Sequence, residues 1–345
     1  MKTVFRKTGA FSQVDLVRLI ATISTVVPVE GMIDGELARV DTGVPSTIVL
    51  RGGRRMAVNI HGPEDGESVV FVHGMLDGSG ATQRLSQLLA DYRIRLICPV
   101  RPCFGRSDPF TDKAAAPENF AADLLEVLDQ LGIDRAGVLG HMAGSVYAFA
   151  AAAILPDRIS SVTNVSGGVP IVSVRQFNLM KRRQRLVALT ARFMPTVLPW
   201  ILGPGISQIK TGGEWAFMNA LYEDAPQDHL VASDPSVFPI LRQGYHFTVE
   251  QGHLAFEIDA AHVTRDWTAY VEATRQPVHL IHGAIDPVVH VDSVRDFQRR
   301  HPSIRMEVHP DAGQLLFYEY PELVIGRLAQ SIQGALRHER HNIAH

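Results

Sequence analysis

The chain has 345 residues, of which 46% are hydrophobic, and its formal net charge is −3 at pH 7. This is enough chain for one large α/β domain with a full hydrophobic core, or for two smaller domains. So small a charge creates no global field that would attract nucleic acid or an anionic membrane. Because no apolar run approaches the roughly 20 residues that a membrane span needs, we expect no membrane partner.

The cysteine content indicates a reducing compartment. The chain has only two cysteines, Cys98 and Cys103, which do not make a disulfide framework. Residues 1–10 are basic but lack the apolar core and the cleavage site of a signal peptide. We therefore predict a cytoplasmic protein, and we predict neither a cofactor nor a metal site.

Residues 1–45 are predicted to form an N-terminal helix and a linker. Ser12 to Asp15 resembles a capping box and precedes an apolar stretch, Leu16 to Ile20, which suggests an amphipathic helix of about three turns. Prolines and glycines are frequent in residues 27–45, a composition that is typical of a linker.

This N-terminal segment also resembles a known DNA-binding unit. Residues 4–9 and 12–19 are similar to the end of a LuxR-type helix-turn-helix domain, and the likeness extends over residues 1–22. It implies the tail of a recognition helix, a turn and a closing helix, with the rest of the unit upstream of Met1. A recognition helix contacts base edges mainly through its N-terminal residues, so we expect no specific DNA binding by this chain alone.

From residue 46 onward, short apolar runs alternate with helical patterns. Residues 47–50 and 55–60 flank two glycines and predict a hairpin. Residues 119–131 predict an amphipathic helix. Further strands are predicted at 68–72, 93–99, 136–139, 161–165, 278–282 and 305–309. The alternation predicts an α/β fold with a mostly parallel, doubly wound sheet.

Residues 171–262 interrupt this alternation. Helices are predicted there at 187–194, 213–222 and 238–256, and together they are rich in Leu, Phe, Trp and Tyr. The sequence therefore predicts a helical insertion between two parts of the strand pattern.

The sharpest local signal lies at residues 136–150. A short apolar run ends at Gly140, and small helix-forming residues follow from Ala143, which predicts a buried strand that turns abruptly into a helix. The spacing Gly140-x-Met142-x-Gly144 is similar to the nucleophile elbow, Gly-x-Ser-x-Gly, of the α/β-hydrolases.

Other motifs extend the resemblance to the α/β-hydrolases over residues 46 to about 337. His73-Gly74, Arg101 to Asp108, Asp286 and Asp311 to Gly313 follow in the order of that superfamily. The resemblance implies a hydrolase domain over residues 46–345, with a helical lid at 171–262 inserted after the sixth strand. Lids of this superfamily usually supply the walls of a pocket for apolar ligands.

The same resemblance implies which positions would carry chemistry. Met142 stands at the nucleophile position, Asp286 at the acid position and Gln314 at the position of the general base. A thioether has no proton to lose, so it cannot accept an acyl group. Glutamine cannot take up and return a proton at neutral pH. Two of the three positions are therefore changed.

The backbone donors of an oxyanion site do not depend on side chains. The resemblance places one donor at Met75 or Leu76, after His73-Gly74, and the other at Ala143. Together with Gly74 and His141, these residues are the predicted ligand-binding set. A nest that binds a carbonyl group or an anion can thus survive the loss of the nucleophile.

Two functions remain open at this point. The first is a sensory or regulatory pseudo-hydrolase that is linked to LuxR-type regulators and binds a small apolar or carbonyl-containing ligand. The second is an unconventional hydrolase or lyase that uses the oxyanion donors, with water activated by Asp286 or His141. Ser145, one helical turn past Met142, is expected to be buried packing. The sequence does not specify an oligomeric state.

Overall fold

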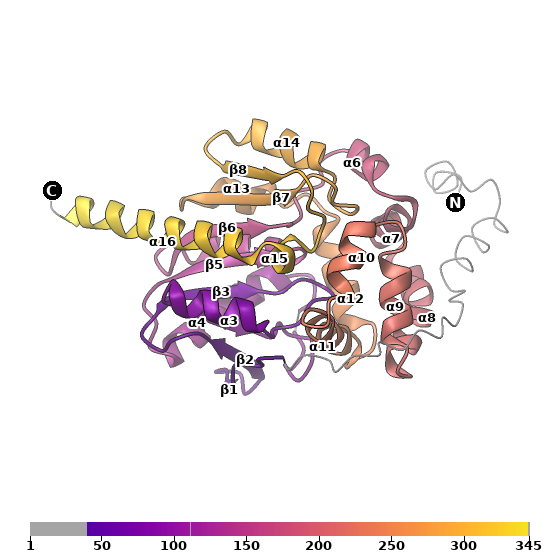
Figure 1. Cartoon of the computed structure of the whole chain (residues 1–345), viewed down its shortest axis with the longest axis horizontal. Coiled ribbons are helices and arrows are strands. Elements are labelled where there is room, and N and C mark those ends of the chain that lie inside the picture. Colours follow the sequence, from indigo (N-terminus) through magenta and orange to yellow (C-terminus); the bar gives the residue numbers. More distant parts are fainter. Residues whose placement is uncertain (1–39, 111, 344–345) are drawn as a thin grey trace.

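A computed structural model of the chain describes residues 40–110 and 112–343. Its centre is an eight-stranded sheet in the order β1-β2-β4-β3-β5-β6-β7-β8 (Figure 1). The strands are β1 (Val44–Val49), β2 (Arg55–His61), β3 (Glu67–Val72), β4 (Ile94–Pro99), β5 (Ala136–His141), β6 (Ile159–Val165), β7 (Val278–Gly283) and β8 (Arg305–His309). β2 runs antiparallel to both of its neighbours, and from β4 onward the strands are parallel. The predicted mostly parallel sheet is confirmed.

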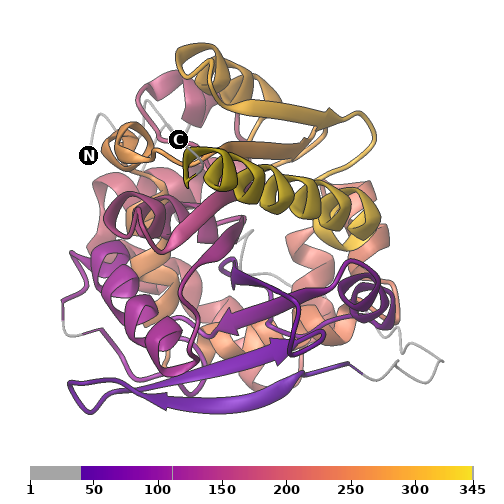
Figure 2. The same cartoon turned by 90° about the vertical axis from the view of Figure 1, so that its left-hand side faces the viewer.

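Helices cover both faces of this sheet. They are α3 (Gln83–Asp91), α4 (Ala116–Gln130), α5 (Gly144–Ile154), α13 (Thr268–Ala273), α14 (Val291–Arg300), α15 (Leu316–Glu319) and α16 (Pro321–Ile343). Figure 2 shows α16, in yellow, running across one face of the strands, with α4 on the opposite face. α4 buries the apolar stripe predicted for it, including Phe120, Leu124 and Leu128. Each face thus has its own hydrophobic layer.

A helical lid separates β6 from the last two strands. It contains α6 (Val174–Leu179), α7 (Arg182–Phe193), a 3₁₀ turn at Pro195–Val197, α8 (Leu198–Lys210), α9 (Glu214–Leu221), α10 (Pro226–Ala232), α11 (Phe238–Val249) and α12 (Leu254–Val263). The prediction of one helix over 238–256 is wrong, because this stretch forms two helices, α11 and α12, with a turn between them. Gly252 stands at the break with φ +82°, a left-handed conformation that an α-helix cannot include.

A buried ion pair joins the lid to the sheet. Arg101, just after β4, is fully buried, and its guanidinium donates to both carboxylate oxygens of Asp259 on α12, at 2.6 and 2.7 Å. The guanidinium also lies 4.4 Å from the ring centres of Phe104 and Tyr147. The Tyr147 hydroxyl donates to Asp259 as well, at 2.8 Å. With this many partners, neither buried charge is left uncompensated.

The N-terminal predictions fall outside the described residues. The proposed capping box, the amphipathic helix and the LuxR-like segment all lie in residues 1–39. The described chain begins beside the sheet, where Asp41 forms an isolated bridge with Ala81. β1 starts at Val44, so the predicted linker extends into this strand. Within the described ranges, no helix is long and apolar enough to cross a membrane.

Candidate functional site

The site is built around the turn between β5 and α5. Met142 occupies this turn with φ +50°, in the left-handed region that non-glycine residues rarely adopt. A Cβ at Gly144 would lie 2.0 Å from the Val72 carbonyl oxygen, and one at Gly140 would lie 2.8 Å from the Ala148 Cβ. The two glycines therefore allow α5 to pack against β3 and β5, and this packing holds Met142 in the strained conformation.

Ser145 has a structural role in this turn. Its fully buried hydroxyl donates to the Met142 carbonyl oxygen at 2.7 Å. The backbone amide of Gly168 approaches the same carbonyl oxygen at 3.3 Å. The hydroxyl is thus engaged in fixing the turn, in line with the packing role expected for it.

The loop after β3 packs against the turn at Met142. The His73 Nδ1–H donates to the Gly74 carbonyl oxygen at 2.7 Å, and the Arg101 amide donates to His73 Nε2 at 3.0 Å. Burial lowers the pKa of His73 to about 4, so the ring is neutral and serves to fix the loop. A Cβ at Gly74 would lie 2.9 Å from the Met142 Cβ, so only glycine fits against the turn.

Backbone donors are available on both sides of the turn. Met75, Leu76 and Ala143 all line a cavity. Their amides form no hydrogen bond with any described residue. Unpaired amides at such a surface can bind the oxygen of a carbonyl group or an anion.

His141 contacts Asp77 of the loop after β3 and does not line the cavity. Its Nδ1 is 2.6 Å from Asp77 Oδ2, and both side chains are fully buried. The rings of Phe71, Phe317 and Tyr318 surround the imidazole. His141 is not among the residues that line the cavity, so it is placed to support the turn and not to touch a ligand.

Asp286 follows β7 and is also buried. Its Oδ1 accepts the amides of Val288 and Val289, at 2.8 and 2.9 Å, and its Oδ2 lies 3.8 Å from His282 Nε2. Burial raises the pKa of Asp286 to about 7, although the two amide hydrogen bonds favour its charged form. The neighbouring Pro287 and Val288 line the cavity, whereas Asp286 lies behind them.

Gln314 follows β8 and lines the cavity. The loop that carries it is held by a residue that the sequence analysis missed, Asp228 of lid helix α10. Asp228 Oδ1 accepts the Leu315 amide at 2.8 Å, and only 1% of Asp228 is exposed. Burial raises the pKa of Asp228 to about 7, and the nearby Asp286 adds to the increase. No motif marks Asp228, because it comes from the lid and not from a strand end.

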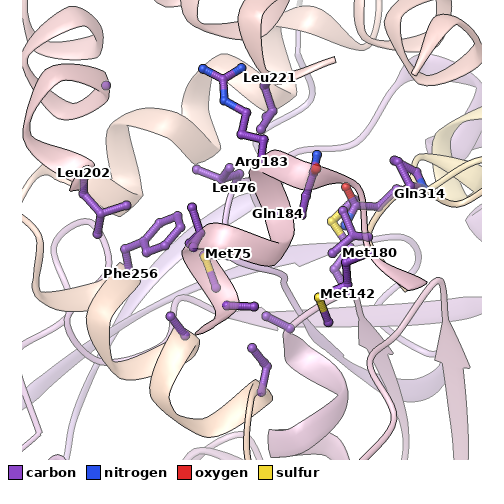
Figure 3. A pocket seen from close by; sticks show the side chains of 18 of the residues that line it. Met75, Leu76, Met142, Met180, Arg183, Gln184, Leu202, Leu221, Phe256 and Gln314 are labelled. Atoms are coloured by element: carbon purple, nitrogen blue, oxygen red, sulfur yellow. The ribbon is translucent and has the colours of Figure 1, made fainter. Parts of the chain in front are cut away.

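The cavity has a volume of about 320 Å³ and lies between the turn and the lid (Figure 3). Three methionines, Met75, Met142 and Met180, line it, together with Leu202, Phe256 and other apolar residues. No aspartate or glutamate is found among its described lining residues. The volume is at the lower end of the range of about 300 to 1,000 Å³ for ligand pockets. The cavity therefore suits a small, mainly apolar molecule.

Comparison with known proteins agrees with this architecture. The sequence profile of the family described as alpha/beta hydrolase fold matches residues 67–201. The bromoperoxidase of Bacillus anthracis superimposes with a TM-score of 0.61 at 16% identity, over 84% of this chain and 100% of that one. The chain has the α/β-hydrolase fold.

Curated relatives match this chain over part of their length. A 2-hydroxy-6-oxononadienedioate/2-hydroxy-6-oxononatrienedioate hydrolase of Klebsiella pneumoniae is 34% identical over 129 residues, which are 35% of this chain and 43% of the relative. An epoxide hydrolase of Caballeronia sordidicola is 32% identical over 128 residues, or 36% and 38% of the two chains. The chain thus spans less than half the length of each.

Proposed function

We propose that this protein is a pseudo-hydrolase that binds a small apolar or carbonyl-containing molecule in the lidded cavity and forms no acyl-enzyme. The observation that carries the proposal is Met142, which stands at the centre of the elbow turn and lines the cavity. A thioether there supplies apolar, adaptable contact area to a ligand, but it supplies no nucleophile.

The position of the general base supports the same proposal. Gln314 lines the cavity where the superfamily order places a histidine, and an amide does not exchange protons at neutral pH. The amides of Met75, Leu76 and Ala143, which are not hydrogen-bonded to any residue that the structure describes, suit the oxygen of a ligand that is bound and then released unchanged.

We further propose that ligand binding regulates a LuxR-type transcription regulator in the cytoplasm. The support is the resemblance of residues 1–22 to the end of such a DNA-binding domain. A regulatory protein of this kind requires a ligand site that does not destroy its ligand. Met142 and Gln314 meet that requirement.

Two measurements test the proposed function. A serine-directed fluorophosphonate probe should not label the native protein stoichiometrically, and a labelled peptide containing Ser145 or Ser166 would overturn the proposal. A thermal-shift screen of acyl lactones, fatty esters and small aromatics should give at least one concentration-dependent rise in Tm. Met142→Trp, which fills the cavity floor, should abolish that rise while the protein stays folded.

The second candidate is an unconventional hydrolase or lyase. Two observations favour it: burial raises the pKa of Asp286, which lies next to the lining residues Pro287 and Val288, to about 7, a value suited to proton transfer near neutrality, and two relatives are named as hydrolases. Turnover of an epoxide or ester substrate that Asp286→Asn abolishes in a folded protein would establish it. Turnover that persists in Asp286→Asn would exclude Asp286 as the base.

A further inference from the structure

We propose that Asp228 is a positioning residue of the cavity. From lid helix α10, its carboxylate holds the loop Gly313–Leu315 and thereby keeps the side chain of Gln314 in the cavity wall. This inference rests on the proposed ligand pocket and adds a lid residue that sets the shape of that pocket.

The contact between Asp228 and the loop is close and buried. Asp228 Oδ1 accepts the Leu315 amide at 2.8 Å, and only 1% of the residue is exposed. A Cβ built on Gly313 would lie 2.4 Å from each carboxylate oxygen. Because real side-chain contacts are never this short, residue 313 must be glycine for the carboxylate to occupy its place.

The loop is also in close contact with the end of β7. A Cβ at Gly283, the last residue of β7, would lie 2.2 Å from the Ala312 carbonyl oxygen and 2.4 Å from that of Gly313. The loop is therefore in contact with both the end of β7 and the Asp228 carboxylate. With its backbone held at these two contacts, the loop presents the Gln314 side chain to the cavity (Figure 3).

A neighbouring contact reinforces the link between α10 and the loop. The Gln227 side-chain amide donates to the carboxylate of Glu319 on α15, the short helix that follows the loop. Two successive residues of α10 thus hold positions 315 and 319. A movement of the lid that withdrew α10 would release Gln314 from the cavity wall at the same time.

Hydrogen exchange tests the contact in the full-length protein without any ligand. Asp228→Ala should raise the exchange rate of the Leu315 amide at least about tenfold, because the amide loses its acceptor. Asp228→Asn retains an oxygen at this place and should preserve most of the protection. The matched control is Asp234→Ala, just after α10, whose exposed carboxylate accepts from Ser236. Unchanged exchange of Leu315 in Asp228→Ala would overturn the inference.

Gly313 provides a compensation test. Gly313→Ala should expel the Asp228 carboxylate and increase Leu315 exchange as Asp228→Ala does. In the Asp228→Ala background the added methyl group has room, so Gly313→Ala should change the exchange rate less than about twofold. Equal effects of Gly313→Ala in both backgrounds would contradict the assigned packing.

A double-mutant cycle tests whether Asp228 acts through Gln314. The cavity probe is the neutral dye N-phenyl-1-naphthylamine. Asp228→Ala should raise the Kd of this dye about tenfold. In a Gln314→Ala background, the same change should raise Kd less than about threefold. An undiminished effect in that background would overturn the positioning role.

The same dye distinguishes a failure of the proposed ligand pocket from a failure of the positioning role of Asp228. Failure of the dye to bind the wild-type protein, or binding that Met142→Trp leaves unaffected, would count against the proposed pocket, and the exchange rates would then decide the role of Asp228. Binding that Met142→Trp abolishes but Asp228→Ala does not alter would overturn the inference and leave the proposed pocket standing.

Discussion

Residue 144 is a glycine because no side chain fits between the elbow and β3. Its Cβ would lie 2.0 Å from the backbone oxygen of Val72, which is not the end of a flexible side chain and cannot move aside. Gly144→Ala should therefore destabilise the fold by about 2 to 4 kcal/mol or prevent folding, since α5 must shift.

The matched control is Gly334→Ala in α16. Nothing lies within 4 Å of a Cβ at Gly334, and alanine in an exposed helix position should stabilise by about 0.5 to 1 kcal/mol. Urea unfolding of both variants checks the comparison. A Gly144→Ala protein as stable as the wild type would mean that the elbow does not pack as described.

Asp286 makes the stability of the protein depend on pH. Burial raises the pKa of this carboxyl from an ordinary value of 3.8 to about 7. The folded state then holds a proton that the unfolded state releases, so the contribution of Asp286 to stability is full below about pH 4 and is lost as the pH rises to about 7.

Asparagine cannot ionise, so Asp286→Asn should escape that loss. We expect the Tm difference, variant minus wild type, to be more positive at about pH 8 than at about pH 5. Thermal unfolding of both proteins at the two pH values measures it. A difference that is the same at both pH values, or more positive at the lower one, would show that Asp286 does not bind a proton in this range.

At the scale of elements, the ion pair between Arg101 and Asp259 fastens the lid to the strand ends. Asp259→Ala would leave the buried guanidinium without its carboxylate, and we expect a loss of about 3 to 5 kcal/mol in the free energy of unfolding. Arg101→Met combined with Asp259→Leu removes both charges and should lose less than the single change.

An exposed ion pair serves as the comparison for the lid contact. Asp65 bonds Arg93 at the surface, where the two side chains are 71% and 64% exposed. Asp65→Ala should therefore cost about 1 kcal/mol or less. Urea denaturation of the three variants measures these losses in the free energy of unfolding. An Asp259→Ala protein no less stable than Asp65→Ala would contradict the role of the ion pair in holding the lid.

At the scale of the whole molecule, the central strands were predictable from sequence because β3, β5, β6 and β7 are short apolar runs that end at or just before a glycine. Gly140, Gly144 and the His73-Gly74 step are local signals of close backbone approach, and they predicted the turn around Met142 correctly. The lid was predicted as helical, but the break at Gly252 was missed because the helical pattern of residues 238–256 continues across it.

The polar contacts of the lid could not be predicted in the same way. Asp228 and Asp259 lie in helices far along the chain from the loops they hold, Gly313–Leu315 and Arg101. No local spacing connects such partners, since only the folded chain brings them together. The sequence likewise did not show that His141 faces Asp77, away from the cavity.

The most direct test of the proposed loss of chemistry is to restore it. Met142→Ser combined with Gln314→His would complete a Ser-His-Asp set with Asp286, in an elbow turn whose glycines are present. The wild type and both single variants should hydrolyse a short-chain nitrophenyl ester near the background rate, because the members of a triad act as a unit. The double variant should exceed both single variants and take up a fluorophosphonate label at position 142. A wild-type protein that already turns over the ester or takes up the label would contradict the account, as would a folded double variant that does neither.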